Sequence, residues 1–357
     1  MTAAGSYLDT LVRRSRVPGI QYLVVGPDDT VFEYAGGWAD IAGCRPMTPA
    51  TTMMAYSMSK TITAVAVLQL AEAGKLNLDD PISFHLPSLP YGRGLTARAL
   101  LSHTAGVPNP IPLRWVHPGT GHTTFDERAA LAEVVRAHPT ATFKPGARYA
   151  YSNIGYWLLG SAVERASGQK FQSYVVDHVF QPLGITPLEL GYDATAGPEH
   201  AHGYLEKYSL LNLVKRFLID RALIGNYEGR WLRIEDHYPN GPAFGGLVGT
   251  AIGFGKFLQD QLRTHSTLFS DATRRLLYTP ARTSDGAEIA MTLGWHIGSL
   301  KNAAFFFKEG GGGGFHSMMR VYPGPGIATV VMTNATGFDV RKLLDALDPE
   351  FMPSTGT

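Results

Sequence analysis

A serine and a lysine three residues apart stand at the start of a long apolar segment. Ser57 and Lys60 open a run that stays apolar almost throughout to Leu70. In a helix, residues three apart share a face, so we expect Lys60 to lie beside Ser57. As the N-cap of a buried helix, Ser57 would sit where free N–H groups favour a developing oxyanion. Burial would lower the pKa of Lys60 enough for it to act as a base.

The same spacing has a second interpretation, because an isolated Ser-x-x-Lys is more often a helix cap beside an exposed lysine. Two other clusters of residues favour the interpretation of Ser57 and Lys60 as a catalytic pair. Tyr151 and Asn153 stand directly before a helix-like segment at 155–167. A phenol held between two ammonium groups would have a lowered pKa and could relay the serine proton. The amide two residues later could hold a substrate carbonyl.

The third cluster lies near the C-terminus. Lys308 ends an aromatic, strand-like run and is followed by Glu309 and the glycines Gly310–Gly314. Lys308 offers a second ammonium, and the glycines would let a substrate lie against the strand backbone. Because the run lacks the GK[ST] ending of a phosphate loop, we interpret it as a strand-end loop near the site.

Strand-like runs at both ends of the chain predict one antiparallel sheet that could carry these residues. The runs are 19–26, 30–37, 303–308, 315–322 and 327–334. A Pro-Asp-Asp turn joins the first two as a hairpin, and a helix at about 338–347 closes the chain.

Helix-like segments separated by Pro and Gly loops fill the middle of the chain. They cover 58–73, 155–167, 171–180, 207–224, 252–262 and 271–278. We expect a discontinuous sheet domain (1–50 and 285–357) and a mainly helical domain (51–284), with the active site at their interface.

The segment near 204–240 is expected to be an insertion in the helical domain. Its helical part carries apolar side chains that could cover the cleft near Trp115 and Tyr151. These are Leu210, Leu211, Leu213, Val214, Phe217, Leu218 and Leu223.

The three clusters, in this order, resemble the penicillin-recognising serine hydrolases, and most closely the branch of class C β-lactamases, DD-peptidases and family VIII carboxylesterases. The resemblance covers about residues 10–345 and implies the α/β (α+β type) β-lactamase/DD-peptidase, or penicillin-binding protein, fold. Other similar stretches are 76–82 (LNLDDPI), 95–108 (LTARALLSHTAGVP), 143–156 (FKPGARYAYSNIGY), 180–185 (FQPLGI), 245–250 (GGLVGT) and 293–295 (LGW).

The resemblance also implies roles, position by position. Ser57 would form the acyl-enzyme, Lys60 and Tyr151 would be the acid/base pair, Asn153 a hydrogen-bond donor to substrate, Lys308 the third-motif cation, Gly310 a substrate-side position, and the amides of Ser57 and Gly311 the oxyanion hole.

One residue departs from the β-lactamase pattern. Where those enzymes usually carry a hydroxyl, this chain has Glu309, which cannot donate a hydrogen bond when ionised and would repel an anionic substrate. Glu309 could also point away, since side chains alternate along a strand. We therefore favour a serine carboxylesterase for small neutral esters, with weak β-lactam hydrolysis allowed. The alternatives are a β-lactamase, a D-aminoacyl peptidase or DD-carboxypeptidase, and a penicillin-binding sensor module that acylates once without turnover.

Composition excludes other classes. With 45% apolar and 17% charged residues the chain is globular, and a net charge of +1 gives no footprint for nucleic acid or a membrane. Cys44 is the one cysteine, and no signal peptide is visible, so we expect a cytoplasmic protein with a small-molecule ester or amide substrate. No metal or organic cofactor is implied. We interpret His103 and the pair His200 and His202 as structural.

Overall fold

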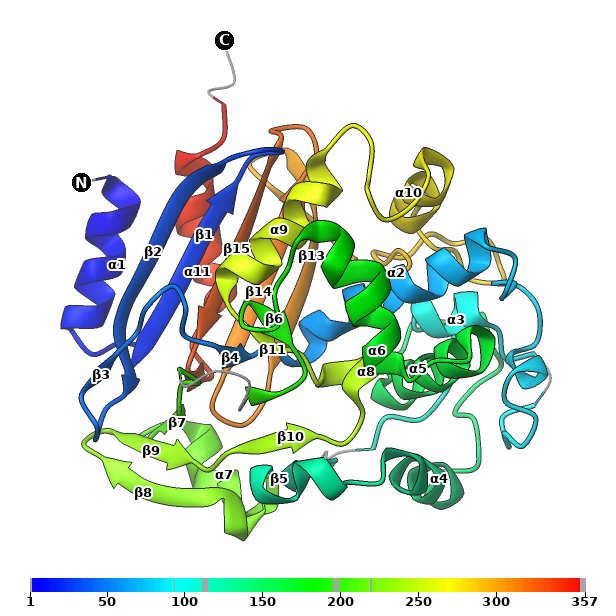
Figure 1. Cartoon of the computed structure of the whole chain (residues 1–357), viewed down its shortest axis with the longest axis horizontal. Helices are drawn as coiled ribbons and strands as arrows, with labels where there is room; N and C mark the ends of the chain where they lie inside the picture. The colour runs from blue at the N-terminus through cyan, green and yellow to red at the C-terminus, as the bar shows by residue number, and fades with distance from the viewer. Residues whose placement is uncertain (1, 93, 111–114, 195–198, 219, 354–357) are drawn as a thin grey trace.

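Strands from both ends of the chain form one antiparallel sheet. The computed structural model describes residues 2–92, 94–110, 115–194, 199–218 and 220–353, except the side chains of 216–218. In this part of the chain the sheet has seven strands (Figure 1). In spatial order they are β12 (His296–Leu300), β13 (Ala303–Gly311), β14 (His316–Tyr322), β15 (Ile327–Thr333), β1 (Gly19–Val25), β2 (Thr30–Asp40) and β3 (Arg45–Pro46). The predicted sheet is confirmed.

Both faces of this sheet are buried, because alternate residues of its strands point to opposite sides. Tyr22 and Val24 of β1 belong to a core that also includes side chains of α1 (Ala3–Arg13) and α11 (Val340–Leu347). Leu23 and Val25 belong to the larger core on the other face, where α9 (Ala251–Leu262) contacts β1 and β15. Figure 1 shows α1 and α11 on one side of the sheet and α9 on the other.

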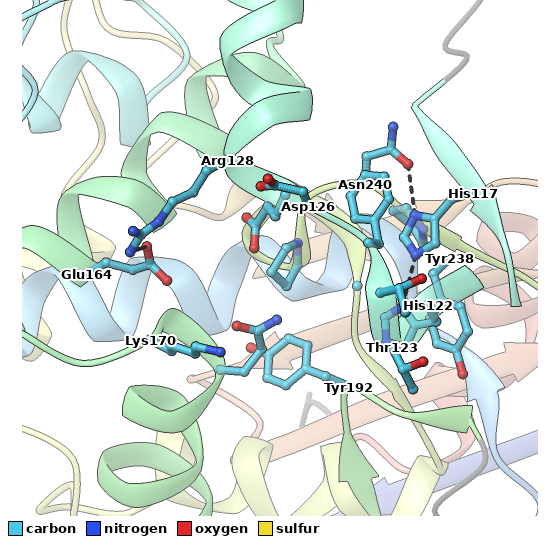
Figure 2. Close-up of a pocket in the computed structure, with 17 residues that line it drawn as sticks. His117, His122, Thr123, Asp126, Arg128, Glu164, Lys170, Tyr192, Tyr238 and Asn240 are labelled. Carbon is cyan, nitrogen blue, oxygen red and sulfur yellow. Dashed lines mark hydrogen bonds and ion pairs between the residues drawn. The ribbon is translucent and has the colours of Figure 1, made fainter. Parts of the chain in front are cut away.

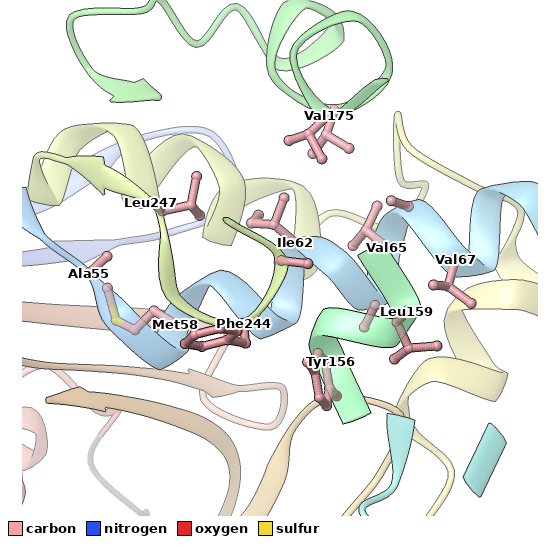
Figure 3. Close-up of a cluster of buried hydrophobic side chains, with 14 of the residues drawn as sticks. Ala55, Met58, Ile62, Val65, Val67, Tyr156, Leu159, Val175, Phe244 and Leu247 are labelled. Atoms are coloured by element: carbon pink, nitrogen blue, oxygen red, sulfur yellow. The ribbon is translucent and has the colours of Figure 1, made fainter. Parts of the chain in front are cut away.

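The helix α2 (Ser59–Glu72) is buried from Ser59 to Leu68, as its nearly uniform apolar surface predicts. It contacts α5 (Asn153–Ser167), α6 (Phe171–Val175) and α8 (Pro242–Gly245). Figure 3 shows Ile62 and Val65 of α2 among side chains of these neighbouring elements. Burial on all sides fixes the helix, and therefore the lysine near its start.

Among the other helices, α10 (Asp271–Tyr278) matches a predicted segment, and α7 (Leu210–Leu218) lies inside one. The helices α3 (Ala97–Leu101) and α4 (Glu127–Ala137) were not predicted. The predicted helix at 171–180 is α-helical only to Val175 and continues as a π-helix over Val176–Phe180.

The segment near 204–240 contributes three strands to a small sheet, besides α7 and a short 3-10 turn at Arg221–Leu223. The predicted helix over 207–224 is therefore wrong for the described residues outside α7 and this turn. The sheet has the order β16 (Ala335–Thr336), β7 (Gly203–Glu206), β9 (Trp231–Ile234) and β8 (Ile224–Glu228). Leu205, Leu232 and Ile234 form its own apolar cluster. Leu232 and Ile234 are two residues apart, the period of a strand rather than of a helix.

Short strand pairs complete the layer around α2. They are β5 (Val116–Pro118) with β10 (His237–Pro239), and β4 (Met53–Met54) with β11 (Val248–Gly249) and β6 (Leu190–Gly191). The division into two domains stays a prediction. No helix of the described residues has the length and apolar character needed to cross a membrane.

Candidate active site

Ser57 lies in a tight turn before α2. The turn is a 3-10 helix over Tyr56–Met58, and α2 begins at Ser59 with no side-chain cap. The predicted N-cap role of Ser57 is therefore wrong. Tyr56 has a φ of +44°, a left-handed conformation that is strained for a residue with a side chain. This turn leaves the Ser57 hydroxyl free to meet other side chains.

Lys60 is fully buried and faces three oxygen atoms. Its Nζ lies 3.0 Å from Ser57 Oγ, 2.7 Å from Asn153 Oδ1 and 2.6 Å from the Phe244 carbonyl oxygen. A neutral amine has two N–H groups, which the amide and carbonyl oxygens accept, so its lone pair is left for the serine. Burial, and then the charge of Lys308, hold the pKa of Lys60 well below its usual value. The predicted lowering is confirmed.

Tyr151 also reaches the serine, with its hydroxyl oxygen 2.6 Å from Ser57 Oγ. Burial raises the pKa of Tyr151, so the predicted lowering is wrong. The ammonium groups of Lys60 and Lys308 lie 4.9 and 5.6 Å from the centre of its ring, over the ring rather than beside the hydroxyl. Because Lys60 and Lys308 are themselves buried, their charged forms are disfavoured. Desolvation of the phenolate is therefore the largest effect on the pKa of Tyr151. Tyr151 therefore keeps its proton and can donate it.

Asn153 is placed by the start of α5. The Ser152 side chain caps this helix by accepting a hydrogen bond from Gly155 N at 3.0 Å. The Asn153 carbonyl oxygen accepts from Lys60, and the residue also lines the pocket next to Ser57. Its role as a donor to substrate stays a prediction.

Lys308 lies on β13 and is fully buried. Its Nζ has no hydrogen-bond partner among the described residues, and burial lowers its pKa to about 7. Gly310, two residues after Lys308 on the same strand, lies directly against the backbone of Ala55. A side chain there would collide with the Ala55 carbonyl oxygen. The predicted third cluster is therefore joined to the turn that carries Ser57.

Glu309 points away from the site, as alternation along the strand allows. It is not among the residues that line the pocket, and its carboxylate pairs with His316 at 2.8 Å and Arg341 at 3.0 Å. These hydrogen bonds lower the pKa of Glu309 to about 2. Because the His316 ring and the Arg341 guanidinium hold this carboxylate, the structure gives no support to the expected repulsion of anionic substrates by Glu309.

The burial of Lys308 predicts a pH-dependent cost in stability. The folded pKa of about 7 lies below the ordinary value of 10.5, so the unfolded chain binds the extra proton between these pH values. We expect Lys308→Met to raise the free energy of unfolding by on the order of 2 kcal/mol at pH 6, and by much less at pH 10. Urea unfolding at both pH values measures this. The exposed Lys75→Met is the control, and a gain that does not change with pH contradicts the prediction.

A pocket of about 540 Å³ opens above Ser57. Ser57, Tyr151 and Asn153 share it with the loop Gly311–Gly313. Its apolar wall comprises Trp115, Val116, Leu205, Leu211, Leu223, Pro239, Phe244 and Phe315.

The expected contribution of the 204–240 segment to this pocket is confirmed for Leu211 and Leu223, which lie there with Trp115 and Tyr151. It is wrong for Leu210 and Leu213, which are 75% and 79% exposed. Val214 is half-buried and does not line the pocket. The expected contributions of Phe217 and Leu218 fall on side chains outside the described part.

Two histidines line this pocket, and both direct their ring nitrogens at other protein atoms. His237 Nδ1 lies 2.8 Å from the Glu235 carbonyl oxygen, and its Nε2 lies 2.9 Å from the Tyr56 hydroxyl. His316 Nδ1 lies 2.6 Å from the Phe338 carbonyl oxygen, and its Nε2 meets Glu309. Neither ring therefore has a nitrogen left for a substrate carboxylate.

A second cavity, of about 520 Å³, lies beside β10 and α8 and has a more polar lining. Figure 2 shows His117 between Asn240 and His122, with Arg128 and Glu164 on the opposite side. None of the residues expected to do chemistry lines this cavity.

The other histidines singled out in the sequence have protein partners. The His103 ring accepts from Ser152 N at 3.2 Å, His200 bonds Thr52 at 3.0 Å, and His202 lies 3.6 Å from Asp40. Over the described residues, no cluster of three or more His, Cys, Asp or Glu is arranged to hold a metal ion.

Sequence reasoning missed residues that complete the site. The Phe244 carbonyl that holds Lys60 carries no sequence signal, because any residue has a carbonyl group. His237 lies 180 residues after Ser57 and is brought to the site by β10. Tyr56 adjoins the nucleophile, and only its position could have singled it out.

A family model described as Beta-lactamase matches residues 5–348. The chain belongs to this family. Penicillin-binding protein 4* of Bacillus subtilis (strain 168) is 26% identical over 300 residues, which are 82% of this chain and 63% of that protein. Protein flp of Staphylococcus aureus (strain MW2) is 28% identical over 185 residues, covering 49% of this chain and 36% of that protein. The chain therefore spans less than two thirds of the length of these curated relatives.

Solved structures share the fold. A penicillin binding protein from Bacillus halodurans is 26% identical with a TM-score of 0.73, covering 96% of this chain and 99% of that one. A D-amino acid amidase from Ochrobactrum anthropi SV3 has a TM-score of 0.79 at 22% identity and covers 98% of both chains. The predicted β-lactamase/DD-peptidase fold is confirmed, and this family member has the framework of a serine hydrolase.

Proposed function

We propose that the protein is a serine carboxylesterase that acts on small neutral esters through an acyl-enzyme at Ser57. The observation that carries the proposal is the combination of an apolar pocket with a serine that lies between a buried lysine and the Tyr151 hydroxyl. Described pocket residues include no lysine or arginine, and both pocket histidines are engaged by protein atoms.

In the first half-reaction, the neutral amine of Lys60 takes the proton of Ser57 across 3.0 Å. The serine oxygen then bonds to the ester carbonyl carbon, and the carbonyl electron pair moves to its oxygen. The amides of Ser57 and Gly311 would stabilise this oxyanion; loss of one such donor typically costs about 10²–10³ in kcat. As the bond to the alcohol oxygen breaks, Tyr151 donates its proton to that oxygen, and the proton held by Lys60 replaces it.

The second half-reaction reverses these roles with water. Lys60 takes a proton from water as the water oxygen bonds to the acyl carbon. Tyr151 donates its proton to the departing Ser57 oxygen, and the proton held by Lys60 then replaces it on Tyr151. The products are a carboxylic acid and an alcohol. The pKa directions support this division of labour: the amine that must accept a proton has a lowered pKa, whereas the phenol that must donate one has a raised pKa.

The pocket supports neutral, apolar substrates over peptides with a free carboxylate. A buried carboxylate needs a charged or hydrogen-bonding partner, and the described lining has few such groups free. Apolar acyl groups gain about 0.8 kcal/mol for each CH₂ that they bury. We therefore expect butyrate and octanoate esters to be better substrates than acetate.

This proposal is tested by steady-state hydrolysis of p-nitrophenyl acetate, butyrate and octanoate beside nitrocefin and D-phenylalanine amide. Ester turnover should exceed turnover of the other two in kcat/KM. Faster nitrocefin hydrolysis would make the protein a β-lactamase, and faster amide hydrolysis would make it an amidase, as the shared fold with the amidase allows. A burst of one equivalent without turnover would indicate the sensor module.

The apolar wall predicts a matched pair of variants on one segment. Leu211→Ser places a hydroxyl in the pocket, and we expect it to lower kcat/KM for octanoate relative to acetate by about tenfold. Leu213→Ser, on the same helix and 79% exposed, is the control and should leave this ratio unchanged. If the octanoate-to-acetate ratio of kcat/KM were the same in both variants, α7 would not contact the acyl group of the substrate.

A further inference from the structure

The residue before the nucleophile makes contacts that the mechanism above does not use. Tyr56 is buried, and its hydroxyl donates to the Gly313 carbonyl oxygen at 2.8 Å. The same hydroxyl lies 2.9 Å from His237 Nε2. Because His237 Nδ1 donates to the Glu235 carbonyl oxygen, Nε2 of the neutral ring is an acceptor, and the single phenol proton is shared between Nε2 and the Gly313 carbonyl oxygen. The phenol therefore connects three segments that are far apart in the chain: the nucleophile turn, the glycine run after β13, and strand β10.

The glycine run is shaped to receive this ring. A side chain at Gly312 would collide with the Tyr56 ring itself, and one at Gly313 would come within 3.0 Å of the His237 ring. Gly310, at the start of the run, lies against the Ala55 carbonyl oxygen. Side chains at Gly310 and Gly312 would overlap the Tyr56 turn, and one at Gly313 would be in tight contact with the His237 ring.

This contact joins the two halves of the proposed oxyanion hole. One amide belongs to Ser57, directly after Tyr56, and the other belongs to Gly311, two residues before Gly313. A hole of this kind stabilises charge only if its donors are already held in place, and a displacement of about 1 Å can cost about 10² in rate.

We propose that Tyr56 is a positioning residue whose phenol, held by His237, ties the glycine run to the nucleophile turn and keeps the two oxyanion-hole amides at a fixed spacing. The inference rests on the proposed function, because it needs an oxyanion at Ser57. Burial raises the pKa of Tyr56, so the phenol stays protonated and remains a donor.

The test is Tyr56→Phe, which keeps the ring and removes the hydroxyl. We expect kcat for p-nitrophenyl butyrate to fall about tenfold to a hundredfold with KM within about twofold of wild type. The affinity for butylboronic acid, whose adduct with the serine mimics the tetrahedral state, should fall by the same factor. If Tyr56 had a purely structural role, Tyr56→Phe would lower thermal stability without a selective fall in kcat and boronate affinity at constant KM.

Three further variants distinguish loss of this contact from misfolding. Tyr278→Phe also removes a buried phenol, which donates to Gln261 at 2.9 Å far along the chain from the site, and should leave kcat within twofold. His237→Leu removes the partner of the phenol and should lower kcat in the same way, whereas His237→Gln keeps a hydrogen-bond acceptor and should restore part of it.

The outcomes separate the two proposals. A wild-type protein that turns over no ester and forms no boronate adduct overturns the proposed function and the bridge with it. Wild-type turnover with an unchanged kcat in Tyr56→Phe overturns the bridge alone. A fall in kcat and boronate affinity at constant KM supports it.

Discussion

Ser57→Ala is expected to lower kcat/KM for p-nitrophenyl butyrate by about 10⁴-fold to 10⁶-fold while the protein stays folded. The hydroxyl is the atom that both Lys60 and Tyr151 face, at 3.0 and 2.6 Å, so its removal leaves the acid/base pair with nothing to activate. The loss of two hydrogen bonds costs on the order of 2 kcal/mol of stability at most. Hydrolysis rates, together with circular dichroism of the same sample, measure both effects.

Ser59→Ala is the matched control for this change. Ser59 is a buried serine two residues later, and its hydroxyl oxygen accepts a hydrogen bond from Leu247 N at 3.0 Å. Its loss should lower stability by about 1 kcal/mol and leave turnover within tenfold. A Ser57→Ala protein that hydrolyses esters at the wild-type rate would exclude the acyl-enzyme at this residue.

Lys60→Met is expected to lower kcat/KM by about 10³-fold to 10⁴-fold, because it replaces the proposed base with a side chain of similar length that cannot accept a proton. It should also change the pH dependence. In the wild type the lysine must be neutral to act, so kcat/KM should rise as pH increases through the lowered pKa of Lys60. The variant should lack this rise, and a pH–rate profile of both proteins measures it.

The control for Lys60 is a lysine that pairs with a carboxylate elsewhere. Lys256, in the middle of α9, lies 2.7 Å from Glu189, and Lys256→Met should leave both the rate and the pH profile unchanged. If Lys60→Met kept the wild-type profile, the proton acceptor would have to be another group, and Tyr151 would be the first to test.

Local sequence patterns determined the parts of the molecule that depend on local physics. The β-rich runs 19–26 and 327–334 predicted strands of one antiparallel sheet, and the apolar run after Ser57 predicted a helix buried nearly all round. The spacing of Ser57 and Lys60 also predicted their contact, because one helical turn suffices to bring them together.

Tertiary structure alone decided the electrostatics of the site. The pKa of Tyr151 is raised rather than lowered, because burial outweighs two cations that lie over its ring. Glu309 faces His316 and Arg341 instead of a substrate, and the Phe244 carbonyl completes the surroundings of Lys60. A pKa depends on solvent exclusion and on the positions of charges, which are set by segments distant in the chain.

The same reason explains the segment near 204–240 and the bridge at Tyr56. The leucines of the 204–240 segment predicted an apolar wall. Only the packing of the folded chain decided that Leu211 faces the pocket and that Leu213 faces solvent. His237 reaches Tyr56 because β10 pairs with β5. Periodicity along a chain specifies which element forms, whereas the contacts between elements specify which atoms meet, and the chemistry of this site depends on the second.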